Sequence, residues 1–281
     1  MSPPGRPKGE FRSAQHGGCL MTTQRKVAIL TGAASGVGAA TARLLAGKGY
    51  QVLINYNRSA VRAQSVVADC IAAGADALAV QGDVAQDKVC EDLVGQAMAR
   101  WGRIDVLVNS AGATRFVPLS NLDGVQAEDF QAIFGVNAIG PFQMARAAAR
   151  HMGHGSAIVN VSSVAGQIGN GSSFPYVLSK AALNALTLGL ARTLAPAIRV
   201  NAVLPGMVQG RWMQEGLGDV AYERVKAQFA DSSLLGEVAT PEHVASAIAW
   251  LLDPQCLMTG QLMVVDGGFT LGRPPSAAGA K

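Results

Sequence analysis

From Lys26 onward, short apolar segments alternate with segments whose apolar residues recur at helical spacing. Residues 27–30 form an uninterrupted apolar run that ends in Thr-Gly, whereas residues 36–48 carry apolar side chains three and four positions apart. The first pattern is typical of a strand buried on both faces, and the second is typical of a helix with one buried face. Repetition of this unit predicts strand–helix–strand crossovers, and therefore a parallel sheet with helices on both sides.

The alternation continues without a linker or an internal repeat. Strands are predicted at 27–30, 51–56, 77–80, 104–109, 157–161, 199–204 and 262–265, and helices at 36–48, 60–73, 86–101, 126–151, 175–194 and 241–252. The predicted fold class is therefore α/β: one Rossmann-type domain over 21–281, with a doubly wound parallel sheet of seven strands and helices on both faces. Residues 206–240 interrupt the series, and we interpret them as a substrate-binding loop.

Composition narrows the functional classes. Hydrophobic residues make up 49% of the 281 residues and charged residues 15%, which allows a large core. The net charge of +4 is not gathered into a basic run, so nucleic-acid binding is not expected. The four cysteines lack CxxC or Cys–His spacing, so we expect no metal site and reduced thiols in a cytoplasmic protein. No apolar stretch is long enough to cross a membrane.

Residues 1–20 differ from the rest of the chain. They are rich in Pro, Gly and charged residues and contain no apolar segment of the kind that a secretory signal requires. We expect them to form a disordered N-terminal extension, and we expect Met21 to be the natural start.

A glycine-rich turn stands where the first strand meets the first helix. Gly32, Gly36 and Gly38 allow a tight turn, close approach of the backbone to a pyrophosphate, and close helix–sheet packing. Ser35 and Val37 lie between them, at a helix N-terminus whose free N–H groups attract phosphate. The turn predicts a dinucleotide site.

The end of the second strand indicates which dinucleotide. A carboxylate at this position would bind the ribose 2′-hydroxyl of NAD, but the chain has Tyr56, Asn57 and Arg58. Because a guanidinium suits a phosphate, NADP(H) is favoured over NAD(H); alternatively, Arg58 is a solvated residue before the next helix. Asp83, which precedes Val84, could accept the adenine amino group or cap the following helix, with Gln86 at the capping-box position.

Tyr176 and Lys180 are four residues apart on a predicted helix, so their side chains share one face. An ammonium beside a phenol lowers the phenol pKa, which suits proton transfer. Ser163 follows the fifth strand at the sheet edge where ligands bind, and its hydroxyl can orient a carbonyl; the neighbouring Ser162 could instead be structural. Asn137 interrupts an apolar helical run, as a satisfied polar group or as the holder of a water that relays protons to Lys180.

These residues together resemble the short-chain dehydrogenase/reductase family, in its branch typified by 3-oxoacyl-carrier-protein reductases. The resemblance covers residues 26–269 and implies an Asn137–Ser163–Tyr176–Lys180 catalytic tetrad and usually a tetramer, built partly through the helices near 126–151 and 175–194. Two positions depart from the family pattern: Ser110 replaces the second Asn of Asn-Asn-Ala-Gly, and no Thr stands near Val208. The expected cofactor-contacting residues are Gly32, Ser35, Gly36, Val37, Gly38, Tyr56, Asn57, Arg58, Asp83, Val84, Asn109, Ala111, Gly112, Tyr176, Lys180, Pro205, Gly206 and Val208.

The sequence thus predicts an NADP(H)-dependent oxidoreductase that reduces a ketone or aldehyde, or oxidises a secondary alcohol, with Tyr176 as general acid or base. The alternatives are an NAD-dependent alcohol dehydrogenase of the same fold and a non-catalytic dinucleotide-binding regulator. The expected partners are a small-molecule carbonyl or alcohol substrate and further copies of this chain, as a homotetramer or dimer. Candidate residues of the substrate pocket are Arg115, Gln167, Arg211, Trp212 and Met213.

Overall fold

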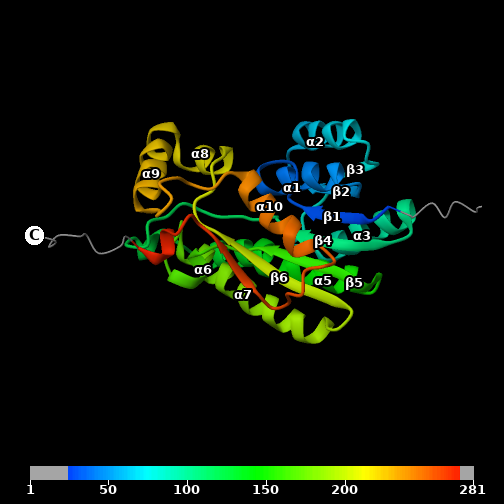
Figure 1. Cartoon of the computed structure of the whole chain (residues 1–281). Coiled ribbons are helices and arrows are strands. Elements are labelled where there is room, and N and C mark those ends of the chain that lie inside the picture. Colours follow the sequence, from blue (N-terminus) through cyan, green and yellow to red (C-terminus); the bar gives the residue numbers. More distant parts are fainter. Residues whose placement is uncertain (1–24, 273–281) are drawn as a thin grey trace, which may run out of the picture.

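A computed structural model describes residues 25–272 of the chain, so the expected extension at 1–20 lies outside the described residues. Figure 1 shows a central twisted sheet with helices packed on both faces. The strands are β1 (Val27–Thr31), β2 (Gln51–Tyr56), β3 (Ala77–Gln81), β4 (Ile104–Asn109), β5 (Met152–Val161), β6 (Ile198–Pro205) and β7 (Leu262–Val265). The larger helices are α1 (Gly36–Gly47), α2 (Ala60–Ala72), α3 (Asp87–Trp101), α4 (Ala127–Phe134), α5 (Gly140–Ala149), α7 (Phe174–Leu194), α9 (Asp219–Ser232) and α10 (Pro241–Leu252), and the short ones are α6 (Ala165–Ile168) and α8 (Arg211–Leu217).

The seven strands lie in the order β3-β2-β1-β4-β5-β6-β7 and every pairing is parallel. The predicted α/β, doubly wound fold is therefore confirmed. Strand order reverses between β1 and β4, and in such sheets ligands bind outside the carboxyl ends of the strands at this point. The glycine-rich turn follows β1, so the fold itself carries that turn to the switch point.

Two apolar cores fill the space between the sheet and its helices. One core joins the sheet to α1, α2 and α10 through residues such as Leu45, Val66 and Ile248, all at most 2% exposed. The other joins the opposite face to α3, α5 and α7 through residues such as Leu93 and Met144. Because both faces are covered, the strands are apolar runs without alternation, as in β1, where every residue is buried.

The structure corrects three expected elements. The expected helix over 126–151 is divided into α4 and α5 by a π-helical segment, Gly135–Ile139, which contains Asn137. Strand β5 begins at Met152 instead of residue 157, with a register shift against β4. Residues 206–240 are not a loop throughout, because they contain the helices α8 and α9.

Two absences apply to residues 25–272. Within this range no helix has the length and apolar character needed to cross a membrane. The same range contains no cluster of three or more His, Cys, Asp or Glu side chains that could hold a metal ion.

Candidate active site

The turn between β1 and α1 has the shape that its glycines predict. Gly32 and Gly36 have φ values of +62° and +55°, which side-chain-bearing residues rarely adopt. A Cβ on Gly32 would lie 2.6 Å from the Cα of Ala111, and one on Gly38 would lie 2.8 Å from the Cα of Ala33. The turn therefore packs backbone against backbone, and Gly32 joins the end of β1 to the segment after β4.

This turn presents free donors to a ligand. Ser35 is the N-cap residue of α1, it is exposed, and its side chain makes no capping hydrogen bond. The N–H groups of the first helical turn have no partner within the helix, and they carry the positive end of the helix dipole. Nothing lies within 4 Å of a Cβ built on Gly36. An open cradle of this kind fits the pyrophosphate of a dinucleotide.

Asn55 braces the turn from β2, a role that the sequence analysis missed. Its side chain is 2% exposed, and its Oδ1 accepts a hydrogen bond from the Gly32 backbone N–H at 3.4 Å. Its Nδ2 donates to the carbonyl of Gly82 at 3.0 Å. A polar residue in the middle of an apolar strand was the available signal, because a buried amide requires partners.

The residues expected at the adenosine end lie at the ends of β2 and β3. Tyr56 is half-buried, and Asn57 and Arg58 are exposed after it. Asp83 accepts a hydrogen bond from the Ala85 backbone N–H at 3.0 Å, but it does not cap α3, whose N-cap residue is Gln86. The capping alternative for Asp83 was therefore wrong. Val84 is 4% exposed and belongs to the core beneath α5.

Asn109, the last residue of β4, and Gly112, three residues later, differ in burial. Asn109 is 2% exposed; its Nδ2 donates to Asn160 Oδ1 at 2.9 Å, and its own Oδ1 has no hydrogen-bond partner. Its side chain therefore joins β4 to β5 inside the protein. Gly112, in contrast, is exposed, and a Cβ there would approach only Asn137 Oδ1 at 3.8 Å and Lys180 Nζ at 4.0 Å.

Ser163, Tyr176 and Lys180 come together at the carboxyl edge of the sheet. Ser163 follows β5 and is 9% exposed, and its side chain forms a hydrogen bond with Tyr176. Tyr176 lies in the first turn of α7, whose N-cap residue Ser173 accepts a hydrogen bond from the Tyr176 backbone N–H. Lys180 follows one turn later, with Nζ 5.6 Å from the centre of the Tyr176 ring.

The close approach of α6 to α7 explains how Ser163 reaches this helix. Gly166 lies on α6, and a Cβ on it would be 2.6 Å from the Lys180 carbonyl carbon and from the Ala181 nitrogen. Ser162 fixes the same junction, because its Oγ donates to Asn184 Oδ1 at 2.6 Å. Ser162 is thus the structural serine, and Gly166 is a residue that the sequence analysis missed.

Burial moves the pKa values of Tyr176 and Lys180 in opposite directions. Desolvation raises the pKa of Tyr176, and the hydrogen bond from Ser163 opposes this rise only in part. The expected lowering of this pKa by the ammonium is not among the causes, and the net shift is upward. Desolvation lowers the pKa of Lys180 to about 8, and its ammonium donates to the Val161 carbonyl at 2.9 Å.

Asn137 lies beside this group with its side chain bound to the protein. Its amide pairs with both backbone groups of Ala113, accepting at 2.8 Å and donating at 2.9 Å, and it also donates to Ser179 Oγ at 2.9 Å. Asn137 therefore fixes the segment after β4 to α7. Its side chain has no free donor for the water relay that the sequence analysis considered.

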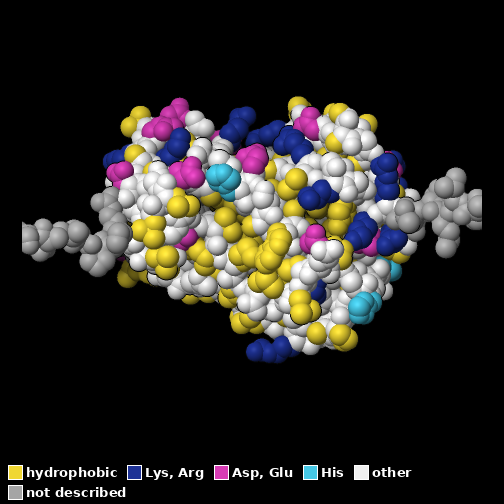
Figure 2. Space-filling view, in the orientation of Figure 1, with side chains coloured by type: hydrophobic (Ala, Val, Ile, Leu, Met, Phe, Trp, Pro, Cys, Tyr) yellow, Lys and Arg dark blue, Asp and Glu magenta, His cyan; other side chains and the backbone are white. Residues whose placement is uncertain are grey.

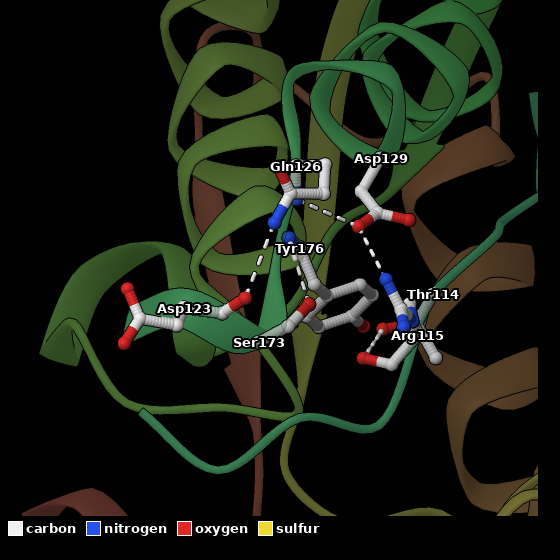
Figure 3. Close-up of polar contacts among 7 residues, drawn as sticks. All are labelled: Thr114, Arg115, Asp123, Gln126, Asp129, Ser173 and Tyr176. Carbon is white, nitrogen blue, oxygen red and sulfur yellow. Dashed lines mark hydrogen bonds and ion pairs between the residues drawn. The ribbon is translucent and has the colours of Figure 1, made fainter. Parts of the chain in front are cut away.

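The segment after β4 carries further contacts to the start of α7. Figure 3 shows the Tyr176 ring extending beside Thr114 and Arg115. Thr114 shares a 2.6 Å hydrogen bond with Ser172, and Arg115 forms an ion pair with Asp129 at 2.5 Å. Together these contacts hold one wall of the site in place.

The segment after β6 forms the opposite wall. Gly206 donates to the Val265 carbonyl at 3.1 Å, and Val208 pairs with Ala239, so the chain leaves the sheet in a fixed direction from Pro205. Helix α8 then brings the Trp212 ring to 6.2 Å from the Tyr176 ring. Of the other expected pocket residues, Met213 packs in an apolar cluster with Met207 and Tyr222, while Gln167 and Arg211 are exposed.

Comparisons with known proteins agree with this geometry. Residues 32–270 match the family model described as enoyl-(acyl carrier protein) reductase. The chain is 38% identical over 251 residues to 3-oxoacyl-[acyl-carrier-protein] reductase of Synechocystis sp., which covers 88% of this chain and 97% of the relative. It is 39% identical over 251 residues to cis-4-hydroxycyclohexanecarboxylate dehydrogenase of Sinomonas cyclohexanicum, which covers 87% and 96%.

A solved structure is similar over almost the same share of the chain. The short-chain dehydrogenase of Burkholderia cenocepacia J2315, in complex with NADP, superposes with a TM-score of 0.80 at 33% identity. The match covers 88% of this chain and 99% of that chain.

Proposed function

Because the chain belongs to the short-chain dehydrogenase/reductase family and is an oxidoreductase that acts on carbonyl or alcohol groups with NAD(P), we propose that it reduces a ketone or aldehyde with NADPH and that Tyr176 donates the proton. The observation that carries the proposal is the hydrogen-bonded Ser163–Tyr176 pair beside the Lys180 ammonium. When bound, the dinucleotide supplies the hydride.

Ser163 and Tyr176 act on the same substrate oxygen. The Ser163 side chain acts on the Tyr176 phenol and lowers its pKa, so a carbonyl oxygen bound beside both hydroxyls can accept from both. As negative charge develops on that oxygen, Ser163 stabilises it and Tyr176 transfers its proton to it. The raised pKa of Tyr176 keeps the phenol protonated at neutral pH, as a proton donor must be.

Lys180 assists the proton transfer from Tyr176. Its ammonium is held by the Val161 carbonyl, 5.6 Å from the centre of the Tyr176 ring. There it stabilises the phenolate that remains after proton transfer. Asn137 is a positioning residue, since its side chain contacts Ala113 and Ser179 but no reacting group.

The test of the mechanism is Tyr176→Phe. Loss of the general acid should lower kcat for carbonyl reduction by about 10²–10⁴-fold, while NADPH binding, followed by its fluorescence, stays within about twofold of the wild type. Tyr50→Phe is the matched control, because it removes the same hydroxyl from a tyrosine buried in the core. Retained turnover in Tyr176→Phe would exclude the mechanism.

NADP(H) is the proposed cofactor because Arg58 is exposed at the end of β2, beside Tyr56 and Asn57, with no carboxylate at these positions. A guanidinium pairs well with a 2′-phosphate. One relative is named for NAD(P)(+) use, and one structural neighbour binds NADP.

Arg58→Ala should weaken NADPH binding by about tenfold or more and change NADH binding by less than about twofold, because only NADPH carries the phosphate. Dissociation constants from fluorescence titration check this prediction. Arg43→Ala, an exposed arginine of α1 paired with Asp69, is the control. Equal losses for the two cofactors would favour the alternative, an NAD-dependent alcohol dehydrogenase of the same fold.

The remaining parts of the proposal concern the molecule as a whole. We expect a single catalytic domain over 21–281, a cytoplasmic location and a homotetramer or dimer. The non-catalytic regulator alternative predicts that the protein binds NADPH but turns over no carbonyl compound.

A further inference from the structure

Three aromatic rings stand in a row across the candidate site. The Trp212 ring of α8 lies 6.2 Å from the Tyr176 ring at 45° and 6.0 Å from the Phe116 ring at 57°. Both centroid distances fall in the range that aromatic pairs prefer. Trp212 therefore links the proton-donating tyrosine of α7 to the segment after β4.

Helix α8 is held close to this row by a glycine. Gly216 follows Trp212 by one helical turn, on the same face of the helix. A Cβ on Gly216 would lie 2.0 Å from a ring carbon of Phe116, which is closer than any real contact. The position of the Trp212 ring is therefore fixed by direct contact between α8 and Phe116.

Charged groups near the row are paired with one another. On α8, Arg211 lies 3.3 Å from Glu215, and Glu215 lies 3.9 Å from Arg62 of α2. Beside Phe116, Arg115 is paired with Asp129, as Figure 3 shows. The charged groups named here therefore have opposite charges beside them, and the groups shown in ring contact with Tyr176 and Phe116 are aromatic.

Part of the indole remains uncovered. Trp212 is 47% exposed although it contacts two rings, so almost half of its surface is open to another group. A substrate carbonyl bound to Tyr176 and Ser163 brings its substituents within reach of the indole, because the Trp212 ring lies 6.2 Å from the Tyr176 ring.

We propose that Trp212 and Phe116 determine substrate specificity and select neutral carbonyl compounds that carry a flat unsaturated ring next to the carbonyl carbon. This inference rests on the proposed carbonyl reduction and names its substrate class. A planar ring can pack on the exposed part of the indole as a fourth member of the row, whereas a saturated ring of similar size cannot make the same contact.

The experiment compares acetophenone with cyclohexyl methyl ketone, which share the methyl ketone and differ in ring saturation. The variants are Trp212→Phe, which keeps an aromatic face, and Trp212→Leu, which keeps apolar bulk without one. We expect the wild type to prefer acetophenone in kcat/KM, Trp212→Phe to keep this preference, and Trp212→Leu to lose about three- to tenfold of it. A wild type without the preference, or equal losses for both ketones in Trp212→Leu, would overturn the proposal.

A binding measurement separates this inference from the proposed function. Both ketones are titrated into Tyr176→Phe loaded with NADPH, with and without Trp212→Leu, and binding is followed by ligand-observed NMR. A preference for acetophenone that depends on Trp212 supports the inference even if the wild type reduces neither ketone, in which case the proposed function fails alone. If the wild type reduces both ketones and neither measurement shows the preference, the inference fails alone.

Discussion

Burial at the active site sets the protonation of single residues. The apolar surroundings that raise the pKa of Tyr176 also lower that of Lys180, because each shift favours the neutral form. The protein therefore holds a neutral phenol beside an ammonium that loses its proton as the pH rises through about 8. A neutral phenol beside an ammonium suits proton donation to a carbonyl, and titration of the ammonium restricts this donation to pH values below about 8.

The pH profile should show this range. As the pH rises through about 8, Lys180 loses its proton in the free enzyme, so kcat/KM for carbonyl reduction should fall. Lys180→Arg, whose side chain stays charged, should have lower activity but no fall near pH 8. Steady-state kinetics between pH 6 and 10 check this, and a wild-type profile that is flat through pH 8 would contradict it.

Stability should change in the opposite direction over the same range. The pKa of Lys180 is about 8 in the folded protein and 10.5 ordinarily, so between these values the unfolded chain binds more protons. The Lys180 contribution to the free energy of unfolding therefore rises from pH 8 to pH 10.5. Urea unfolding at pH 7.5 and 9.5 measures the free energy of unfolding of the wild type and of Lys180→Met. The wild type should gain stability at pH 9.5 relative to Lys180→Met, which has no ammonium to titrate.

The sequence indicated which side chains share one helix face but not which residues support them. The four-residue spacing of Tyr176 and Lys180 is a property of one helix and is visible in one segment. Asn55 and Gly166 act across elements that are distant in sequence, so nothing near them indicates their partners. The side-chain role of Asn137 was open for the same reason, since Ala113 and Ser179 meet it only after folding.

Among the elements, α8 packs against Phe116 at Gly216, where a side chain has no room. A helix interior normally gains stability when Gly is replaced by Ala. At Gly216 the added methyl group would collide with Phe116, so the usual gain is opposed by displacement of the helix.

Gly216→Ala should therefore raise the KM for the carbonyl substrate severalfold and leave the Kd for NADPH unchanged. Gly95→Ala is the matched control, since Gly95 lies within α3 and nothing stands within 4 Å of its Cβ position. The control should raise the free energy of unfolding by about 0.5–1 kcal/mol without a kinetic effect. Unchanged KM in Gly216→Ala would show that α8 moves freely.

The sequence patterns predicted the sheet and its covering helices but not α8 and α9. The strands and covering helices carry long apolar stripes, which reveal their period. In α9 only Tyr222 is fully buried and in α8 no residue is, and the apolar residues that pack there, Met213, Leu217, Val225 and Phe229, form short rows that are only partly buried. Glycines at 210, 216 and 218 also read as loop residues, although they cap or pack these helices.

At the scale of the whole molecule, two exposed faces are apolar. One lies on α7, on the start of α5 and on the π-helical segment before it, and includes Leu178, Phe142 and Ile139, each 43–48% exposed. The other lies on α10, with Trp250, which is 50% exposed, and on the segment between α10 and β7, with Leu257, which is 98% exposed. Figure 2 shows hydrophobic side chains gathered across the middle of the face over α10, with charged groups mainly toward the rim. Contiguous apolar surface of this kind is typical of interfaces between proteins.

We expect each face to join a different pair of subunits in a tetramer. Phe142→Glu and Leu257→Glu should then each yield dimers, and the double variant should yield monomers. Light scattering after size-exclusion chromatography measures the masses. Val220→Glu, at an exposed residue of α9, should leave the assembly unchanged. A monomeric wild type would contradict the expectation.

Helix α7 has both an inner and an outer side. Tyr176 and Lys180 lie on the side of the candidate active site, and Leu178, between them in sequence, is 48% exposed on the outside. If a neighbouring subunit covers Leu178, it restrains the very turn that aims the phenol. Turnover per subunit would then depend on enzyme concentration, and dilution would reduce it before any strand of the sheet came apart.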